Sequence, residues 1–101
     1  MKVILQQRAA IAKRSLTPSE RNQVVKAINS LNELNFENAL NSPKFYKLTG
    51  LSKTHQTQLY AYRVNSRLRL MISIDEDKWI IEDIVDYHGH SSRLFLIQEK
   101  A

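Results

Sequence analysis

The chain has 101 residues, of which 43% are hydrophobic and 25% charged, and this predicts one hydrophobic core in a single domain over residues 1–101. It has no cysteine, which excludes disulfides and thiolate metal sites, and it carries a formal net charge of +5. Residues 1–15 hold too short an apolar run for a secretory signal, and nothing approaches a membrane span, so we expect a cytoplasmic protein without a membrane partner.

The first half of the chain predicts one strand and two helices. Residues 1–6 favour a strand at the edge of a sheet, and residues 8–15 favour a short helix with Ala9 and Ala12 on one side. The sequence from Thr17 to Glu20 is a capping box with proline at the first helical position, so a second helix begins at Pro18 and runs to residue 34. Its buried stripe comprises Val24, Ala27, Ile28, Leu31 and Leu34, with Val25 alongside.

Residues 35–58 predict loops around one short extended segment. A polar loop over 35–43 has room for one helical turn at 36–40, and Pro43 marks its end because proline disfavours helix in the residue before it. Residues 44–48 lead to Gly50, and residues 52–58 resemble an exposed loop or hairpin tip.

Residues 59–64 and 68–74 predict a β-hairpin with two candidate registers. A two-residue turn would place Tyr62 opposite Arg69, whereas a three-residue turn over 65–67 would place Arg63 opposite Arg69. Burial favours the three-residue turn, although Arg67 would then take a left-handed position usually given to glycine. That register collects an apolar face from Tyr60, Tyr62, Val64, Leu68, Leu70, Ile72 and Ile74.

The opposite face of this hairpin would carry two facing arginines. Like charges in opposed positions cost stability unless an anion lies between them, so Arg63 and Arg69 form a candidate phosphate clamp. In the alternative, Asp83 or Asp86 on the next strand neutralises them. The region 38–74 has no acid, which favours RNA or an acidic protein as partner, and a merely solubilising surface is an equal alternative. Its six bases are Lys44, Lys47, Lys53, Arg63, Arg67 and Arg69.

Residues 79–87 predict a third strand after a turn at 75–78, and histidines follow it. The apolar residues of this strand do not alternate strictly, which indicates burial on both faces or a bulge. His88 and His90 lie just past its end, and two histidines without a third ligand nearby do not predict a metal site. Because histidine titrates near neutral pH, either one is a candidate proton donor or acceptor.

Three segments together resemble the RelE/ParE superfamily of bacterial toxins: KFYKLTGL at 44–51, LYAYRVNSRLRLMISI at 59–74 and IIEDIVDYHGHSSRLF at 80–95. The resemblance covers residues 44–95 and extends to the first half of the chain only through the order of elements. It implies an α+β fold, a small, twisted, mostly antiparallel sheet with two N-terminal helices packed on one face. It also implies a toxin that is paired with a cognate antitoxin and needs no cofactor.

Many members of that superfamily cut mRNA on the ribosome without a metal ion, and the resemblance carries their roles to residues of this chain. His90, or alternatively His88, would be the general acid or base. Arg69 would stabilise the phosphate, with Arg63 or Arg93 assisting. Residues expected to contact RNA are Lys44, Lys47, Lys53, Arg67 and Phe95.

The chain departs from that pattern in three places. Phe95 has no hydroxyl and could stack on a base but not transfer a proton, and Ser91 stands where an arginine often follows the histidine. The hairpin is one residue longer than usual, which leaves the choice between Arg67 and Arg69 open. Two alternatives therefore accompany the endoribonuclease: a gyrase-inhibiting toxin of the ParE type, and an inactive binding module with the same fold.

Overall fold

A computed structural model of the chain describes residues 1–48 and 57–86. Along the described residues, one strand is followed by three helices and then by four strands, and the undescribed residues 49–56 lie between β2 and β3. In chain order they are β1 (Lys2–Leu5), α1 (Gln7–Arg14), α2 (Pro18–Asn32), α3 (Phe36–Leu40), β2 (Phe45–Lys47), β3 (Tyr60–Arg63), β4 (Leu68–Asp75) and β5 (Lys78–Asp86).

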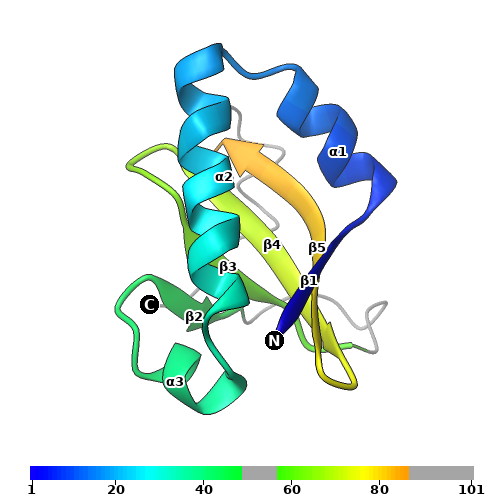
Figure 1. Cartoon of the computed structure of the whole chain (residues 1–101), viewed down its shortest axis with the longest axis vertical. Helices are drawn as coiled ribbons and strands as arrows, with labels where there is room; N and C mark the ends of the chain where they lie inside the picture. The colour runs from blue at the N-terminus through cyan, green and yellow to red at the C-terminus, as the bar shows by residue number, and fades with distance from the viewer. Residues whose placement is uncertain (49–56, 87–101) are drawn as a thin grey trace.

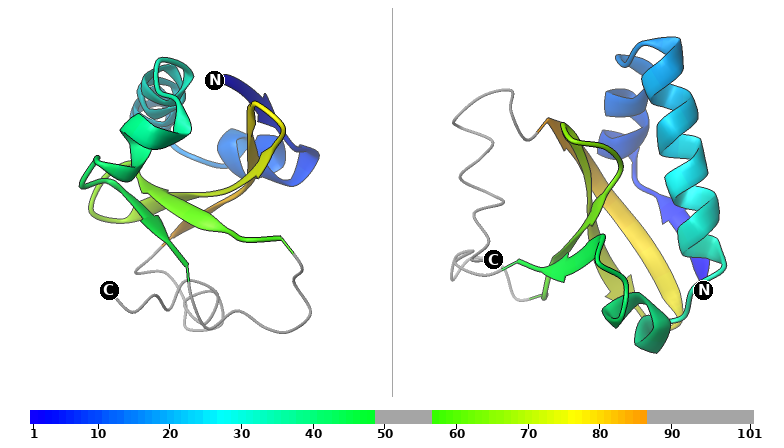
Figure 2. Two further views of the ribbon diagram at one scale, coloured as in Figure 1. Left: turned by 90° about the horizontal axis from the view of Figure 1, so that it is seen from below. Right: turned by 90° about the vertical axis from the view of Figure 1, so that its left-hand side faces the viewer.

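The described strands form one twisted sheet in the order β1-β5-β4-β3-β2. All neighbours are antiparallel except β1 and β5, which are parallel, so β1 is an edge strand as predicted. Helices α1 and α2 lie on the same face of the sheet, while the short α3 lies at one end beside β2 (Figures 1 and 2). The predicted α+β class and its arrangement are confirmed. No helix in the described ranges is both long and apolar enough to cross a membrane.

Helix α2 begins as the capping box predicts. The Thr17 hydroxyl accepts from the Glu20 amide and the Glu20 carboxylate accepts from the Thr17 amide, each at 3.2 Å. Val24 and Leu31 are fully buried against the sheet. The prediction that Val25 joins this stripe is wrong, because one residue turns the side chain about 100° around the helix and leaves Val25 40% exposed. The helix ends at Asn32, two residues earlier than predicted.

Trp79 ties the helical layer to the sheet. Its side chain is fully buried in the core between the two layers, and its indole N–H donates to the carbonyl oxygens of Leu31 at 2.9 Å and Leu34 at 3.2 Å. Both carbonyls also accept other hydrogen bonds, from the Leu34 amide at 2.9 Å and from the Met1 amino group at 2.8 Å, so the indole adds a second donor to each and has its own N–H satisfied in the core. The Phe45 ring packs edge-on against Trp79, with ring centres 5.4 Å apart.

The β3–β4 hairpin adopts the predicted three-residue turn, with Arg63 opposite Arg69. Its conformation differs from the prediction at Arg67, since Glu76 is the one non-glycine residue with positive φ among the described residues. The Asn65 side chain stabilises the turn, which was expected to need a residue in the left-handed conformation. Its Oδ1 accepts from the amides of Arg67 at 2.7 Å and Leu68 at 2.8 Å.

Strand β5 is buried on both faces and is also bulged, so both readings of its irregular pattern are correct. Met71 pairs with Asp83 and the next residue, Ile72, pairs with Ile81, which leaves Glu82 as the extra residue. Ile84 faces the helices, while Val85 belongs to a second cluster on the other face. The bulge lets one strand supply apolar side chains to both faces.

Candidate functional site

The face of the sheet that points away from α1 and α2 is called the distal face here. Its apolar centre is a small buried cluster that Tyr46 packs against. Cross-strand pairing places Arg63 and Arg69 on this same face, at the end of β3 and the start of β4. The cluster consists of Leu48, Leu59, Ala61, Met71 and Val85.

Arg69 is held in one orientation by hydrogen bonds to Tyr46 and to two backbone carbonyls. Its Nε donates to the Tyr46 hydroxyl at 3.1 Å, and its Nη1 donates to the carbonyl oxygens of Asn65 at 2.7 Å and Leu68 at 3.2 Å. The residue is only 8% exposed. A guanidinium is planar and rigid, so contacts on two of its nitrogens fix the plane in which it meets an anion.

Arg63 stands opposite Arg69 and is exposed. Its Nε donates weakly to the same Asn65 carbonyl, at 3.4 Å, and it forms no ion pair with any carboxylate of the described residues. The two guanidinium groups are therefore gathered around one turn, where an anion bound between them would relieve their repulsion.

Arg67 pairs with Asp86 on β5 and with Glu20 on α2. The alternative in which Asp83 or Asp86 neutralises Arg63 and Arg69 stays a prediction. Hydrogen bonding from the Thr17 backbone amide, followed by the Arg67 guanidinium, lowers the pKa of Glu20. Arg67 thus connects the hairpin to the helical layer, with two carboxylates around its charge.

Two residues of the distal face were not assigned a functional role from the sequence. Tyr46 was missed because the segment 44–48 was too short to fix which side chains share a face; its pairing with Ala61 settles this. Asp83 was weighed only as a counter-charge. It is 4% exposed, lies opposite Met71 on the distal face, and accepts from the Ile84 amide at 2.8 Å.

The remaining predicted site residues are divided. Lys44 adjoins Arg63, whose amide donates to its carbonyl at 2.8 Å, whereas Lys47 pairs with Tyr60 and points to the helical side. Among the residues that the structure describes, no three histidine or carboxylate side chains are placed to hold a metal ion. Five predicted site residues lie outside the described ranges: Lys53, His88, His90, Arg93 and Phe95.

Comparison with solved structures identifies the architecture. The RelE–RelB complex from Pyrococcus horikoshii matches with a TM-score of 0.63 at 17% identity, over 89% of this chain and 97% of that one. This chain has the RelE fold. The RelB–RelE antitoxin–toxin complex from Methanococcus jannaschii matches at 0.61 and 14% identity, over 85% and 92% of the two chains. The YoeB dimer from Staphylococcus aureus matches at 0.59 and 17%, over 87% and 97%. No protein-family model and no curated protein sequence matches the chain.

Proposed function

We propose that this RelE-fold chain is the toxin of a type II toxin–antitoxin module and that it cleaves mRNA on the ribosome without a metal ion. The observation that carries the proposal is Arg69, a largely buried guanidinium held by Tyr46 and by two carbonyls of its own hairpin, with Arg63 facing it. A cation fixed in this way is suited to a phosphate whose charge increases during reaction.

The proposed reaction is an internal transfer at phosphorus. The ribose 2′-oxygen loses its proton and bonds to the adjacent phosphorus, and the bond from phosphorus to the 5′-oxygen breaks. The products are a cyclic phosphate and a 5′-hydroxyl that has gained a proton. His90, or His88 in its place, would take or give these protons, and Arg69 would stabilise the charge on the phosphate with Arg63 or Arg93 assisting.

In this proposal, RNA is contacted by basic residues on and near the β3–β4 hairpin and by residues outside the described ranges. Lys44 lies next to Arg63, while Lys47 and Lys53 would bind phosphates further along the strand, and Phe95 would stack on a base. We assign Arg67 a structural role in place of the predicted RNA contact, because its guanidinium group already pairs with Glu20 and Asp86.

The partners in this proposal are a cognate antitoxin, the mRNA and the ribosome, in the cytoplasm. Two of the matching structures are complexes of RelE with RelB, and one is described as an antitoxin–toxin complex. An antitoxin that binds this chain would stop cleavage by covering or distorting the Arg63–Arg69 turn, or by keeping the chain off the ribosome.

The direct test is cleavage of mRNA on programmed ribosomes by purified protein. Arg69→Ala is expected to cut about a hundred- to a thousandfold more slowly than wild type, the usual loss when one preorganised donor to a charged transition state is removed. Lys2→Ala, a charge loss on the exposed edge strand β1, should cut at the wild-type rate.

Three results would contradict the proposal or parts of it. Equal rates for Arg69→Ala and wild type would remove Arg69 from the mechanism. Wild-type rates for His88→Ala, His90→Ala and the double variant would remove both histidines. A wild-type protein that cuts no mRNA and instead blocks DNA gyrase, or does neither, would support the gyrase-inhibiting toxin or the inactive binding module.

A further inference from the structure

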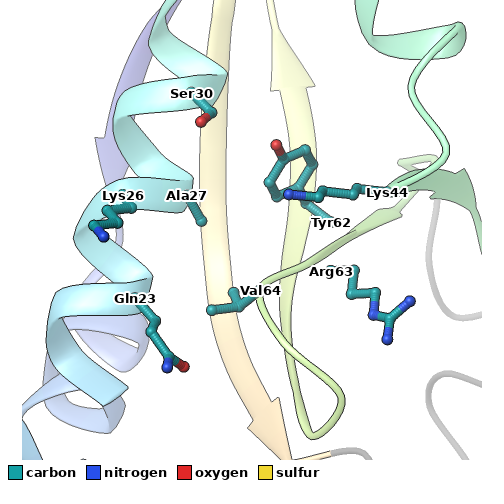
Figure 3. Close-up of a pocket in the computed structure, with 8 residues that line it drawn as sticks. All are labelled: Gln23, Lys26, Ala27, Ser30, Lys44, Tyr62, Arg63 and Val64. Atoms are coloured by element: carbon teal, nitrogen blue, oxygen red, sulfur yellow. The ribbon is translucent and has the colours of Figure 1, made fainter. Parts of the chain in front are cut away.

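A polar groove of about 170 Å³ lies between helix α2 and strand β3, on the helical side of the sheet. Helix α2 contributes Gln23, Lys26 and Ser30 to its walls, and Lys44 and Tyr62 come from the sheet side. Ala27 on α2 and Val64 after β3 add apolar side chains to the lining (Figure 3). No carboxylate lines it.

The Tyr62 hydroxyl is the first sign of a ligand. Tyr62 is only 4% exposed, and its hydroxyl makes no hydrogen bond with any residue in the described ranges. A buried hydroxyl without a partner normally costs stability, so such a group on the wall of a groove is placed to donate to a bound oxygen. Figure 3 shows the hydroxyl directed from β3 toward α2, across the groove.

Lys44 supplies positive charge at the same place, because it lines the groove and extends from the sheet side toward α2 (Figure 3). Lys26 also belongs to the lining, but its side chain points away from Tyr62 and Lys44 (Figure 3). Neither lysine forms an ion pair with a described carboxylate. Ser30 adds a hydroxyl from α2, so an anionic group would meet hydrogen-bond donors from both walls and positive charge from Lys44.

Arg63 connects this groove to the distal face. It belongs to the groove lining, but its guanidinium points away from Lys44, Tyr62 and α2 (Figure 3). Across the hairpin it faces Arg69. Lys44, Arg63 and Arg69 therefore form a row of cations that runs from the groove, around the hairpin, to the distal face.

We infer that the groove is a second phosphate site, which binds an RNA backbone phosphate outside the bond to be cut. The inference rests on the proposed function, since it requires RNA on the distal face. Phosphates follow one another along a nucleic-acid strand, so a single strand would present successive phosphates to Lys44, Arg63 and Arg69. Lysine binds phosphate as a compact charge, and the tyrosine hydroxyl supplies a directed donor.

The experiment measures binding of a short 2′-O-methyl RNA, which cannot be cleaved, to the full chain over a range of salt concentrations. Lys44→Gln is expected to weaken binding and to reduce the slope of log K against log salt by about 0.7, the value for one phosphate contact on a single strand. Tyr62→Phe should weaken binding about tenfold without changing the slope, since it removes a neutral donor to a charged oxygen. Lys2→Gln is the matched control with the same charge loss, and it should keep the wild-type slope and affinity.

The outcomes separate this inference from the proposed function. If Lys44→Gln and Tyr62→Phe both bind RNA as Lys2→Gln does, the groove is not a phosphate site and the proposed function stands unchanged. If wild-type protein binds no RNA even at low salt, the inference is overturned, and the proposed function fails only if the same protein also cuts no mRNA on programmed ribosomes. If both variants lose binding to a penta-glutamate peptide but not to RNA, the groove accepts protein carboxylates and the inference is overturned. Circular dichroism and urea midpoints of each variant verify that these differences do not come from unfolding.

Discussion

Burying an arginine costs free energy, and Arg69, which is only 8% exposed, shows how that cost is offset. Carbonyl oxygens from its own hairpin accept from one nitrogen and the Tyr46 hydroxyl accepts from another. Buried cations need such partners because removing charge from water is costly. The same bonds prevent the side chain from swinging into solvent, which is the condition for using it as an ordered anion receptor.

Tyr46 is expected to act as a positioning residue. Tyr46→Phe keeps the ring against the distal cluster and removes one acceptor from Arg69, so mRNA cleavage should fall about tenfold, as for the loss of one hydrogen bond to a charged group. The fall should appear in kcat more than in KM if Arg69 acts on the transition state. Tyr60→Phe, which removes a hydroxyl from the helical face, is the control. Equal losses in both variants, or a change in KM alone, would argue against positioning.

Glu20 predicts a specific dependence of stability on pH. Its pKa lies below the ordinary value of 4.5 because the Thr17 amide and then Arg67 favour the carboxylate. A lowered pKa in the folded state adds stability above the unfolded pKa, and this stability disappears as the pH falls through the folded value. Urea midpoints of wild type should therefore drop below about pH 4.5 more steeply than those of Glu20→Gln.

Other carboxylates also titrate in this range, so the comparison needs a second variant. Glu33→Gln, at the exposed end of α2, removes a carboxylate that has no ion pair with the described residues. It should retain the steep wild-type fall. A Glu20→Gln curve parallel to wild type would show that the Thr17 and Arg67 contacts do not stabilise the fold.

At the scale of elements, the two hairpin turns reverse the direction of the chain by different means. The β3–β4 turn uses the Asn65 side chain to bond two backbone amides, and the β4–β5 turn places Glu76 at φ 57°. Left-handed backbone costs a residue with a Cβ roughly 1–2 kcal/mol, and only glycine avoids this. The exposed Glu76–Lys78 contact at 3.8 Å offsets little of that cost.

Glu76→Gly should therefore stabilise the protein. The relief of left-handed strain exceeds the extra freedom that glycine gives the unfolded chain, so the free energy of unfolding should rise by about 0.5–1 kcal/mol. Urea denaturation measures the change, and Asp77→Gly in the same turn, at a residue without positive φ, should instead lower stability. A loss of stability in Glu76→Gly would contradict this account of the turn.

Sequence patterns predicted those elements whose structure follows from local chemistry or from burial. The capping box determined where α2 begins, and the need to bury seven apolar side chains together determined the register of the hairpin. Sequence patterns did not predict the position of a side chain where that position depends on one polar contact between residues far apart in the sequence. Nothing near Arg67 in the sequence indicates Glu20 as its partner, 47 positions away, and a strand of three residues does not reveal that Tyr46 faces Arg69.

At the scale of the whole molecule, Trp79 holds the two layers together and is the single tryptophan of the chain. Trp79→Phe removes buried volume and both indole hydrogen bonds to the end of α2, and should lower the free energy of unfolding by roughly 2–4 kcal/mol. Circular dichroism is the suitable measurement, since the variant loses the fluorophore. Leu40→Ala, at a side chain that is 55% exposed, should change stability by less than about 0.5 kcal/mol. A Trp79→Phe midpoint equal to wild type would show that other contacts join the layers.

The parallel pairing of β1 with β5 has a consequence for how the chain folds. Lys2 pairs with Lys78 and Leu5 with Ile81, so the first strand finds its place only after most of the chain has been synthesised. Contacts between such distant residues must overcome a large loss of chain entropy, and they slow folding from microseconds toward milliseconds or longer. During translation, β1 and α1 have no strand to pack against until β5 has left the ribosome. A nascent chain that stops before β5 would lack Trp79 and the strand that joins β1 to the rest of the sheet, and would therefore be open to proteolysis.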